Sequence, residues 1–129
     1  MESKTFIIVN PTAGEGKAKK IWQNFEYDLK KNNIHHHAVI TEYQNHATEL
    51  ISRAVSSGYN RIGVFSGDGT LNEVLQGLFH DGKIISDNLK LIFFPAGSSC
   101  DFEKKFNHKR DWIERIQAND TVSIDIFKV

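Results

Sequence analysis

The segment FSGDGTLNEV, residues 65–74, places an acid between two glycines, just where an apolar run gives way to a mixed polar and apolar pattern. Residues 61–65 are short, apolar and β-prone, which predicts a buried strand. Thr70 and Glu73 have the spacing of a capping box, so we predict a helix over residues 71–79. A strand, a glycine turn and a helix in this order present free backbone N–H groups at one point. An anion is the expected occupant of such a point.

Capping alone requires neither Asp68 nor a glycine on each side of it. Gly67 and Gly69 allow positive φ angles and a close approach of the backbone to a ligand. A carboxylate beside phosphate groups repels them unless a cation lies between, and Mg²⁺ is the cation that bridges a carboxylate and nucleotide phosphates. The alternative is a tight turn in which Asp68 only favours left-handed backbone geometry.

The composition narrows the class of protein. The 129 residues include 16 Lys and Arg against 16 Asp and Glu, so the chain lacks the broad basic field of a nucleic-acid-binding protein. Cys100 is the single cysteine, which rules out an internal disulfide and fits a reducing compartment. No apolar run approaches the length of a membrane span, and the first residues do not resemble a signal peptide. We therefore expect a cytoplasmic globular domain.

Predicted strands and helices alternate along most of the chain. Short apolar strands joined by helical crossovers predict an α/β fold with a doubly wound, mostly parallel sheet and helices on both faces. The expected strands are residues 4–10, 34–41, 61–65, 89–95 and 121–129, and the expected helices are residues 17–32, 45–58, 71–79 and 111–118. In the first helix the apolar face is expected to consist of Ile21, Trp22, Phe25 and Leu29. Gly58 is expected to stop the second helix.

Three glycine-containing loops follow strands of this predicted sheet. Their sequences are NPTAGEGK, SGDGTLNE and PAGSSCD, and because each follows a strand, all three should lie at the edge where ligands bind in such sheets. In the first loop Pro11 stiffens the exit from the strand and Gly14 opens space, although an ordinary strand–helix connection is an equal alternative. In the third loop Ser98 is positioned to donate to a phosphate, and Asp101 has the spacing of a helix cap. Neither a Walker loop nor a Rossmann fingerprint is present.

Other candidate sites are weaker. His35, His36 and His37 alternate across a predicted strand, so their side chains cannot all face one metal ion. Cys100 has no evident neighbouring base that would activate it as a nucleophile. A basic cluster near the end of the chain is interpreted first as a solvated face and second as a contact with an anionic membrane surface; its members are Lys104, Lys105, His108, Lys109 and Arg110.

Taken together, the loops resemble those of the diacylglycerol kinase catalytic domain superfamily, which includes bacterial diacylglycerol kinases, related lipid kinases and sphingosine kinases. The matching segments are NPTAGEGKA, ITEYQNHATELI, SGDGTLNEVLQGL and FFPAGSSCDF, in the family's order. The resemblance implies that the protein uses ATP and Mg²⁺ and transfers a phosphoryl group to a lipid hydroxyl. It implies a catalytic and metal-positioning role for Asp68. The nucleotide-lining residues that it implies are Asn10, Pro11, Thr12, Ala13, Gly14, Thr41, Gly67, Asp68, Gly69, Thr70, Leu71, Asn72, Glu73 and Ser98.

Two positions depart from the family's pattern. Ser66 stands where a glycine usually precedes Gly-Asp-Gly, as in the sphingoid kinase branch, and Cys100 stands where the family has Asn. The resemblance also implies a second, β-sandwich domain that follows this one, and in bacterial diacylglycerol kinases that domain supplies a catalytic acid. Residues 121–129 resemble the strand that leads into it.

The resemblance therefore predicts that residues 1–129 form a single nucleotide-binding domain, inactive alone and part of a longer kinase. The expected partners are ATP and a lipid with a free hydroxyl, with no nucleic acid. A peripheral location at a membrane surface and a homodimer are both compatible with this interpretation. Two alternatives stay open: an enzyme similar to NAD kinases, and a non-catalytic nucleotide-binding or regulatory module.

Overall fold

The computed structural model describes residues 4–12, 17–80, 83–84 and 89–95. The elements run in the order β1 (Thr5–Val9), α1 (Lys17–Lys31), β2 (His36–Ile40), α2 (His46–Ser56), β3 (Arg61–Ser66), α3 (Asp68–Leu78), β4 (Phe79–His80), β5 (Lys83–Ile84) and β6 (Lys90–Pro95). The helix predicted over residues 111–118 and the strand predicted over residues 121–129 lie outside the described residues.

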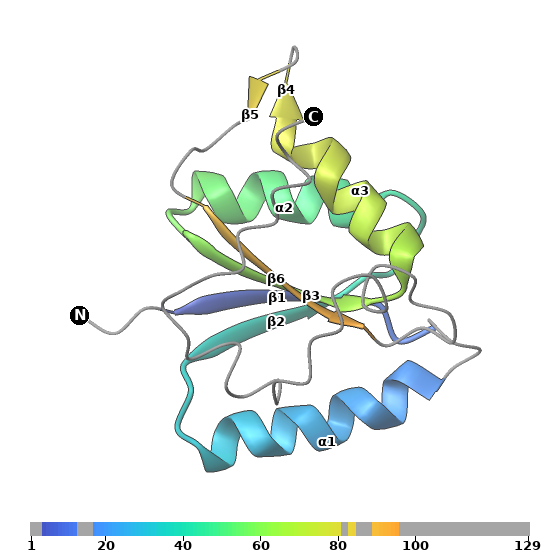
Figure 1. Cartoon of the computed structure of the whole chain (residues 1–129), viewed down its shortest axis with the longest axis vertical. Helices are drawn as coiled ribbons and strands as arrows, with labels where there is room; N and C mark the ends of the chain where they lie inside the picture. Colours follow the sequence, from blue (N-terminus) through green and yellow to red (C-terminus); the bar gives the residue numbers. More distant parts are fainter. Residues whose placement is uncertain (1–3, 13–16, 81–82, 85–88, 96–129) are drawn as a thin grey trace.

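The main sheet has four strands in the order β2-β1-β3-β6, and every neighbouring pair is parallel. The helix α1 covers one face of this sheet, and α2 and α3 cover the other (Figure 1). The short strands β4 and β5 form a separate antiparallel pair. The predicted doubly wound α/β fold is therefore confirmed for the described part of the chain.

The central strands carry apolar side chains on both faces, as strands covered by helices on both sides must. In β1, Ile7 and Val9 contact the residues of α1, whereas Phe6 and Ile8 belong to the cluster below α2 and α3. All six residues of β3 are buried, including the glycine Gly63. This burial fixes β3 between its neighbours and holds the turn that follows it in a defined place.

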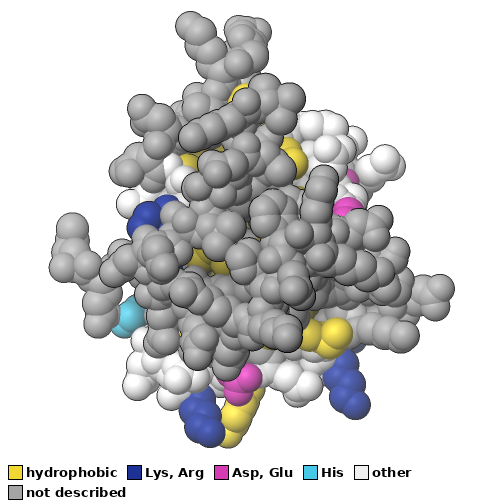
Figure 2. Space-filling model, viewed as in Figure 1, with side chains coloured by type: hydrophobic (Ala, Val, Ile, Leu, Met, Phe, Trp, Pro, Cys, Tyr) yellow, Lys and Arg dark blue, Asp and Glu magenta, His cyan; other side chains and the backbone are white. Residues whose placement is uncertain are grey.

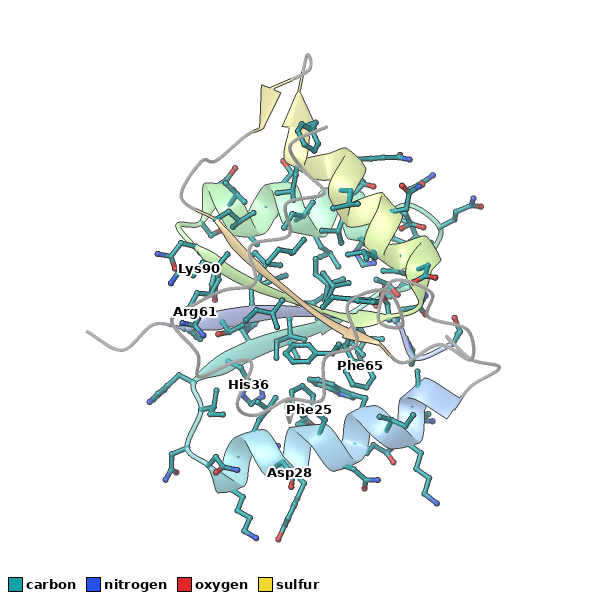
Figure 3. The ribbon with its side chains drawn as sticks, viewed as in Figure 1. Phe25, Asp28, His36, Arg61, Phe65 and Lys90 are labelled. Atoms are coloured by element: carbon teal, nitrogen blue, oxygen red, sulfur yellow. The ribbon has the colours of Figure 1, made fainter. Side chains whose placement is uncertain are left out.

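Aromatic rings fill the layer between α1 and the sheet. Phe25 of α1 stacks on Phe65 of β3 with ring centroids 5.9 Å apart, and Trp22 meets Phe65 edge-on at 5.3 Å (Figure 3). Ile21 is not part of this layer, although the sequence predicts it on the buried face. It is 38% exposed, because the buried stripe follows Ala18, Trp22, Phe25 and Leu29.

The helices α2 and α3 approach each other closely. Thr48 Oγ1 of α2 donates a hydrogen bond of 2.8 Å to the backbone oxygen of Glu73 in α3. A Cβ atom added to Gly77 would lie 2.7 Å from the backbone oxygen of Thr48 and would overlap Ile51 Cγ2. Gly77 is therefore the position that lets the two helix backbones come together.

The end of α2 agrees with the sequence. Gly58 has a φ of +95°, and its N–H donates to the backbone oxygen of Val55 at 3.0 Å, as expected of a glycine that stops a helix. The β4–β5 pair was not predicted, since two residues per strand carry no detectable periodicity. In the described part of the chain, no helix combines the length and the apolar character that crossing a membrane requires.

Candidate functional site

The carboxyl ends of β1 and β3 form the topological switch point of the sheet. The chain leaves β1 toward α1 on one face and leaves the adjacent β3 toward α3 on the other face (Figure 1). The backbone N–H of Asn10 donates to the oxygen of Phe65 at 2.9 Å, so the two strands stay paired beyond the last residue of β1. In doubly wound sheets, ligands bind outside the strand ends at such a point.

The side chain of Asn10 joins the loop after β1 to the first turn of α3. Asn10 Nδ2 donates to Thr70 Oγ1 at 2.7 Å, across 60 positions of sequence. Asn10 Oδ1 accepts from the backbone N–H of Thr12 at 3.0 Å and from Thr12 Oγ1 at 2.7 Å. These bonds confirm that the first and second of the three predicted loops meet. The third loop, with Ser98, Cys100 and Asp101, lies outside the described residues.

The first turn of α3 is not built as the sequence predicts. The helix begins at Asp68, its N-cap is Gly67 in an extended conformation (φ −85°, ψ −174°), and no side chain of the described residues caps it. The capping-box prediction for Thr70 and Glu73 is therefore wrong. Thr70 already lies inside the helix, where its hydroxyl accepts from Asn10 instead. Since no side chain of the described residues caps this turn, its first N–H groups are suited to bind an anion.

The structure gives neither of the two glycines of this turn the positive φ angle that the sequence predicts. Gly67 has a negative φ, and Gly58 is the positive-φ glycine among the described residues. A Cβ atom added to Gly69 would meet nothing within 4 Å. The prediction of positive φ angles at Gly67 and Gly69 is therefore wrong. What Gly69 provides is open space beside the first turn of α3.

Asp68 is the first residue of α3, where a carboxylate interacts favourably with the positive end of the helix dipole. The residue is half-buried, and its Oδ1 is shielded from solvent. The described residues contain no group of three His, Cys, Asp or Glu that would hold a metal ion. A single carboxylate fits a Mg²⁺ ion that is bound chiefly by phosphate and water oxygens, which is how Mg²⁺ commonly binds nucleotides.

The loop after β2 reaches the same edge. The N–H of Thr41 donates to the backbone oxygen of Val9 at 2.8 Å. Beyond it, Tyr43 stacks on His46 with centroids 4.2 Å apart and an interplanar angle of 16°. Tyr43 OH donates to Glu49 Oε2 at 2.6 Å, and this hydrogen bond raises the pKa of Tyr43 above its ordinary value. Tyr43, His46 and Glu49 were not predicted from the sequence to form a cluster. The three-residue spacing of the two rings was the available signal.

The remaining residues that were predicted to line the nucleotide differ in their exposure to solvent. Leu71 is 4% exposed and packs in the core, so its side chain does not face the sheet edge. Asn72 is exposed, Glu73 and Pro11 are half-buried, and Thr12 is exposed. Ala13 and Gly14 lie outside the described residues. Among the described residues, no hydrogen bond joins Asn72 or the Glu73 carboxylate to the Asn10–Thr70 pair.

The three consecutive histidines at the start of β2 and the basic residues Arg61 and Lys90 lie away from this edge. His35 and His37 are exposed while His36 is half-buried, which agrees with the predicted alternation across β2. Arg61 and Lys90 begin paired strands at the opposite, amino edge (Figure 3). Burial lowers the pKa of Arg61. On the face shown in Figure 2, the coloured Lys and Arg side chains are scattered rather than gathered. The predicted basic cluster of residues 104–110 lies outside the described residues.

The model of the diacylglycerol kinase catalytic domain family matches residues 4–129. The chain belongs to this family. The "Putative lipid kinase YtlR" of Bacillus subtilis is 36% identical over 120 residues, which cover 89% of this chain and 37% of that protein. Sphingosine kinase 1 of Rattus norvegicus is 34% identical over 107 residues, covering 81% of this chain and 28% of that protein.

A solved structure of the family agrees with the fold. The crystal structure of a diacylglycerol kinase from Bacillus anthracis superposes with a TM-score of 0.60 and 28% sequence identity, covering 81% of this chain and 37% of that one. The chain thus spans between about a quarter and two fifths of the length of these relatives. Its membership of a lipid kinase family, predicted from the loops, is confirmed.

Proposed function

We propose that this chain forms the ATP-binding part of a lipid kinase that transfers the γ-phosphate of ATP to a lipid hydroxyl of the diacylglycerol type. The observation that carries the proposal is the Asn10–Thr70 hydrogen bond of 2.7 Å, which holds the loop after β1 against the uncapped first turn of α3. Phosphate groups suit this position because backbone N–H groups and the helix dipole both favour an anion there. Membership of the family supports a phosphoryl donor as that anion.

The chain's own residues act by binding and orientation. The N–H groups at the start of α3 and the hydroxyl of Thr70 hold phosphoryl oxygens, and the absence of a side chain at Gly69 leaves room for them. Asp68 would hold a Mg²⁺ ion beside the phosphates, and the ion would supply neutralisation of the charge on the transferred group. The described residues of this arrangement position and neutralise the phosphate, and we assign the base for the acceptor hydroxyl to another part of the protein.

The lipid acceptor has consequences for location. Because such a lipid resides in a bilayer, we place the working enzyme in the cytoplasm at the surface of a membrane. The proposal includes no contact with nucleic acid, in keeping with the equal numbers of acidic and basic residues.

Thermal unfolding with and without nucleotide tests the proposal on the 129-residue chain. MgATP at about 100 times its dissociation constant should stabilise the fold by about 2.7 kcal/mol. ATP with EDTA should give a smaller shift, and NAD should give none. A flat response to millimolar MgATP, with no heat of binding in calorimetry, would contradict an ATP site, and stabilisation by NAD would favour an enzyme similar to NAD kinases.

The acceptor is tested on a longer protein that contains this chain. Radiolabelled phosphate should pass from ATP to diacylglycerol in mixed micelles, and Asp68→Asn should abolish the transfer. Transfer to NAD instead of lipid would overturn the choice of acceptor while leaving the ATP site in place.

A further inference from the structure

We propose that Asn10 is a positioning residue that turns the hydroxyl of Thr70 into a hydrogen-bond donor toward a phosphoryl oxygen of the bound nucleotide. Asn10 would thus act on the ligand through Thr70 rather than by contacting it. This inference rests on the proposed function and assigns separate roles to two residues that the family pattern places together on the nucleotide.

The orientation of the Asn10 amide is fixed by its neighbours. A backbone N–H can only donate, so the Asn10 atom 3.0 Å from the N–H of Thr12 must be the oxygen Oδ1. The hydroxyl of Thr12 donates to the same oxygen at 2.7 Å. Two hydrogens therefore occupy both lone pairs of Oδ1, and the amide cannot flip without setting its NH₂ group against the backbone N–H.

The fixed amide then determines the direction of the Thr70 hydroxyl. Asn10 Nδ2 has no lone pair, so the 2.7 Å bond requires Thr70 Oγ1 to accept and its own hydrogen to point elsewhere. Thr70 is only 6% exposed, and its hydroxyl donates to no atom of the described residues. A buried donor without an acceptor is unfavourable, and a charged oxygen at the start of α3 would satisfy it.

The place of Thr70 supports a phosphoryl oxygen as that acceptor. Thr70 lies in the first turn of α3, whose N–H groups no side chain of the described residues caps. The hydroxyl and these N–H groups are donors on one short stretch of chain, beside the open space at Gly69. Several donors converging on one point suit an oxyanion better than any neutral ligand.

A double-mutant cycle separates this role from direct binding by Asn10. In Asn10→Asp the carboxylate still accepts from Thr12 but cannot donate to Thr70, so the Thr70 hydroxyl reverses and donates to it. Thr70→Val removes the hydroxyl and should weaken ATP binding by about 10- to 100-fold, the range for a hydrogen bond to a charged group. Since both changes remove the same donor, the double variant should bind ATP as Asn10→Asp alone does.

The experiment measures ATP and adenosine affinities by titration, together with the unfolding temperature of each variant without ligand. Thr70→Ser keeps the hydroxyl, so its ATP affinity should return from the value of Thr70→Val to that of the unaltered chain. Adenosine affinity should be the same in all variants, because adenosine has no phosphate. Losses that add in the double variant would show that Asn10 binds the nucleotide independently and would overturn the inference alone. Equal losses of adenosine and ATP affinity would reduce the pair to a structural role. Absence of ATP binding by the unaltered chain would overturn the proposed function and the inference with it.

Discussion

The helices α2 and α3 lie on the same face of the sheet and begin at the same edge, but their first turns are held in different ways. The start of α2 is fixed by its own neighbourhood: Tyr43 stacks on His46 and bonds to Glu49, and the N–H of Glu42 donates to His46 Nδ1 at 3.0 Å. The start of α3 is fixed by Asn10, which lies 60 positions away. Neither helix has a hydrogen bond from a capping side chain within the described residues.

The first turn of α2 is stabilised by residues close to it in sequence, whereas the first turn of α3 is suited to binding a ligand. In α2, the backbone N–H groups of His46 and Thr48 donate to the backbone oxygens of Tyr43 and Asn45, so these donors of the turn find acceptors within three residues of sequence. In α3, the distant hydrogen bond anchors Thr70 at the side, and no capping side chain of the described residues occupies the end of the helix. The same helix dipole is present in both, so the availability of the end, more than the dipole, distinguishes a site from a helix start.

The largest expected effect comes from breaking the contact between the two helices. Gly77→Ala should lower the free energy of unfolding by about 1–3 kcal/mol, because the new methyl group meets the backbone of Thr48 and the side chain of Ile51. The denaturant midpoint measures this loss.

Gly69→Ala is the matched control in the same helix. It carries the same change in helix propensity, worth at most about 1 kcal/mol in favour of Ala, and its methyl group meets nothing. Its fold should be as stable as the parent or more so, while its affinity for MgATP falls because the methyl group occupies the ligand's space. Equal destabilisation by the two variants would show that the two ends of α3 do not differ in packing.

The second largest effect concerns the charge of Asp68 at the start of α3. Asp68→Asn keeps the shape of the side chain and removes its charge, so the Mg²⁺-dependent part of ATP affinity should fall on the order of tenfold, or roughly 1.4 kcal/mol. The loss of unfolding free energy without ligand should stay below about 1 kcal/mol, the limit for one charge at a helix end. Titration with Mg²⁺ and with EDTA measures both proteins. An identical Mg²⁺ dependence in the two would leave Asp68 as an ordinary first residue of a helix.

The smallest expected effect concerns the hydrogen bond between Tyr43 and Glu49 at the start of α2. The hydrogen bond to Glu49 favours the neutral phenol, so the stability it contributes is present below the ordinary Tyr pKa of 10.0 and is lost as the pH rises through the raised pKa of folded Tyr43. Glu49→Ala should return the pKa of Tyr43 toward 10.0, as followed by the absorbance of tyrosinate. Glu42→Ala should lower it less, since Glu42 acts only through its charge. An unchanged titration in Glu49→Ala would mean that the bond does not persist in solution. ATP binding should stay unaltered in both.

Periodic features of the sequence predicted most of the fold. The strand predicted over residues 61–65 is β3 with one residue added, and the helix predicted over residues 17–32 is α1 with one residue removed. Apolar runs and helical spacing are local properties, and burial on both faces of the sheet reinforces them. Ile21 was predicted on the buried face because it is next to Trp22, which is buried. The apolar pattern of one helical turn does not distinguish between these two adjacent positions.

The site was predicted less completely, and Thr70 shows why. The three-residue spacing to Glu73 favours a local cap, whereas the partner that the structure gives Thr70 lies in another loop. No spacing rule reaches across 60 positions without the sheet that brings β1 beside β3. The meeting of two loops followed from the parallel topology and is confirmed. The roles of the individual residues toward a nucleotide stay predictions.

The separation of Asn10 from Thr70 also has a consequence for how the chain folds. Their hydrogen bond depends on the pairing of β1 with β3, and α1, β2 and α2 lie in the chain between these two strands. Contacts of such large sequence separation form slowly, because the entropy of closing the loop is lost before any contact compensates for it. In a partly folded chain that has formed α3 but has not docked β1, the Thr70 hydroxyl is not anchored by Asn10. A ligand that requires the anchored hydroxyl would therefore bind the fully folded chain in preference to such a partly folded one.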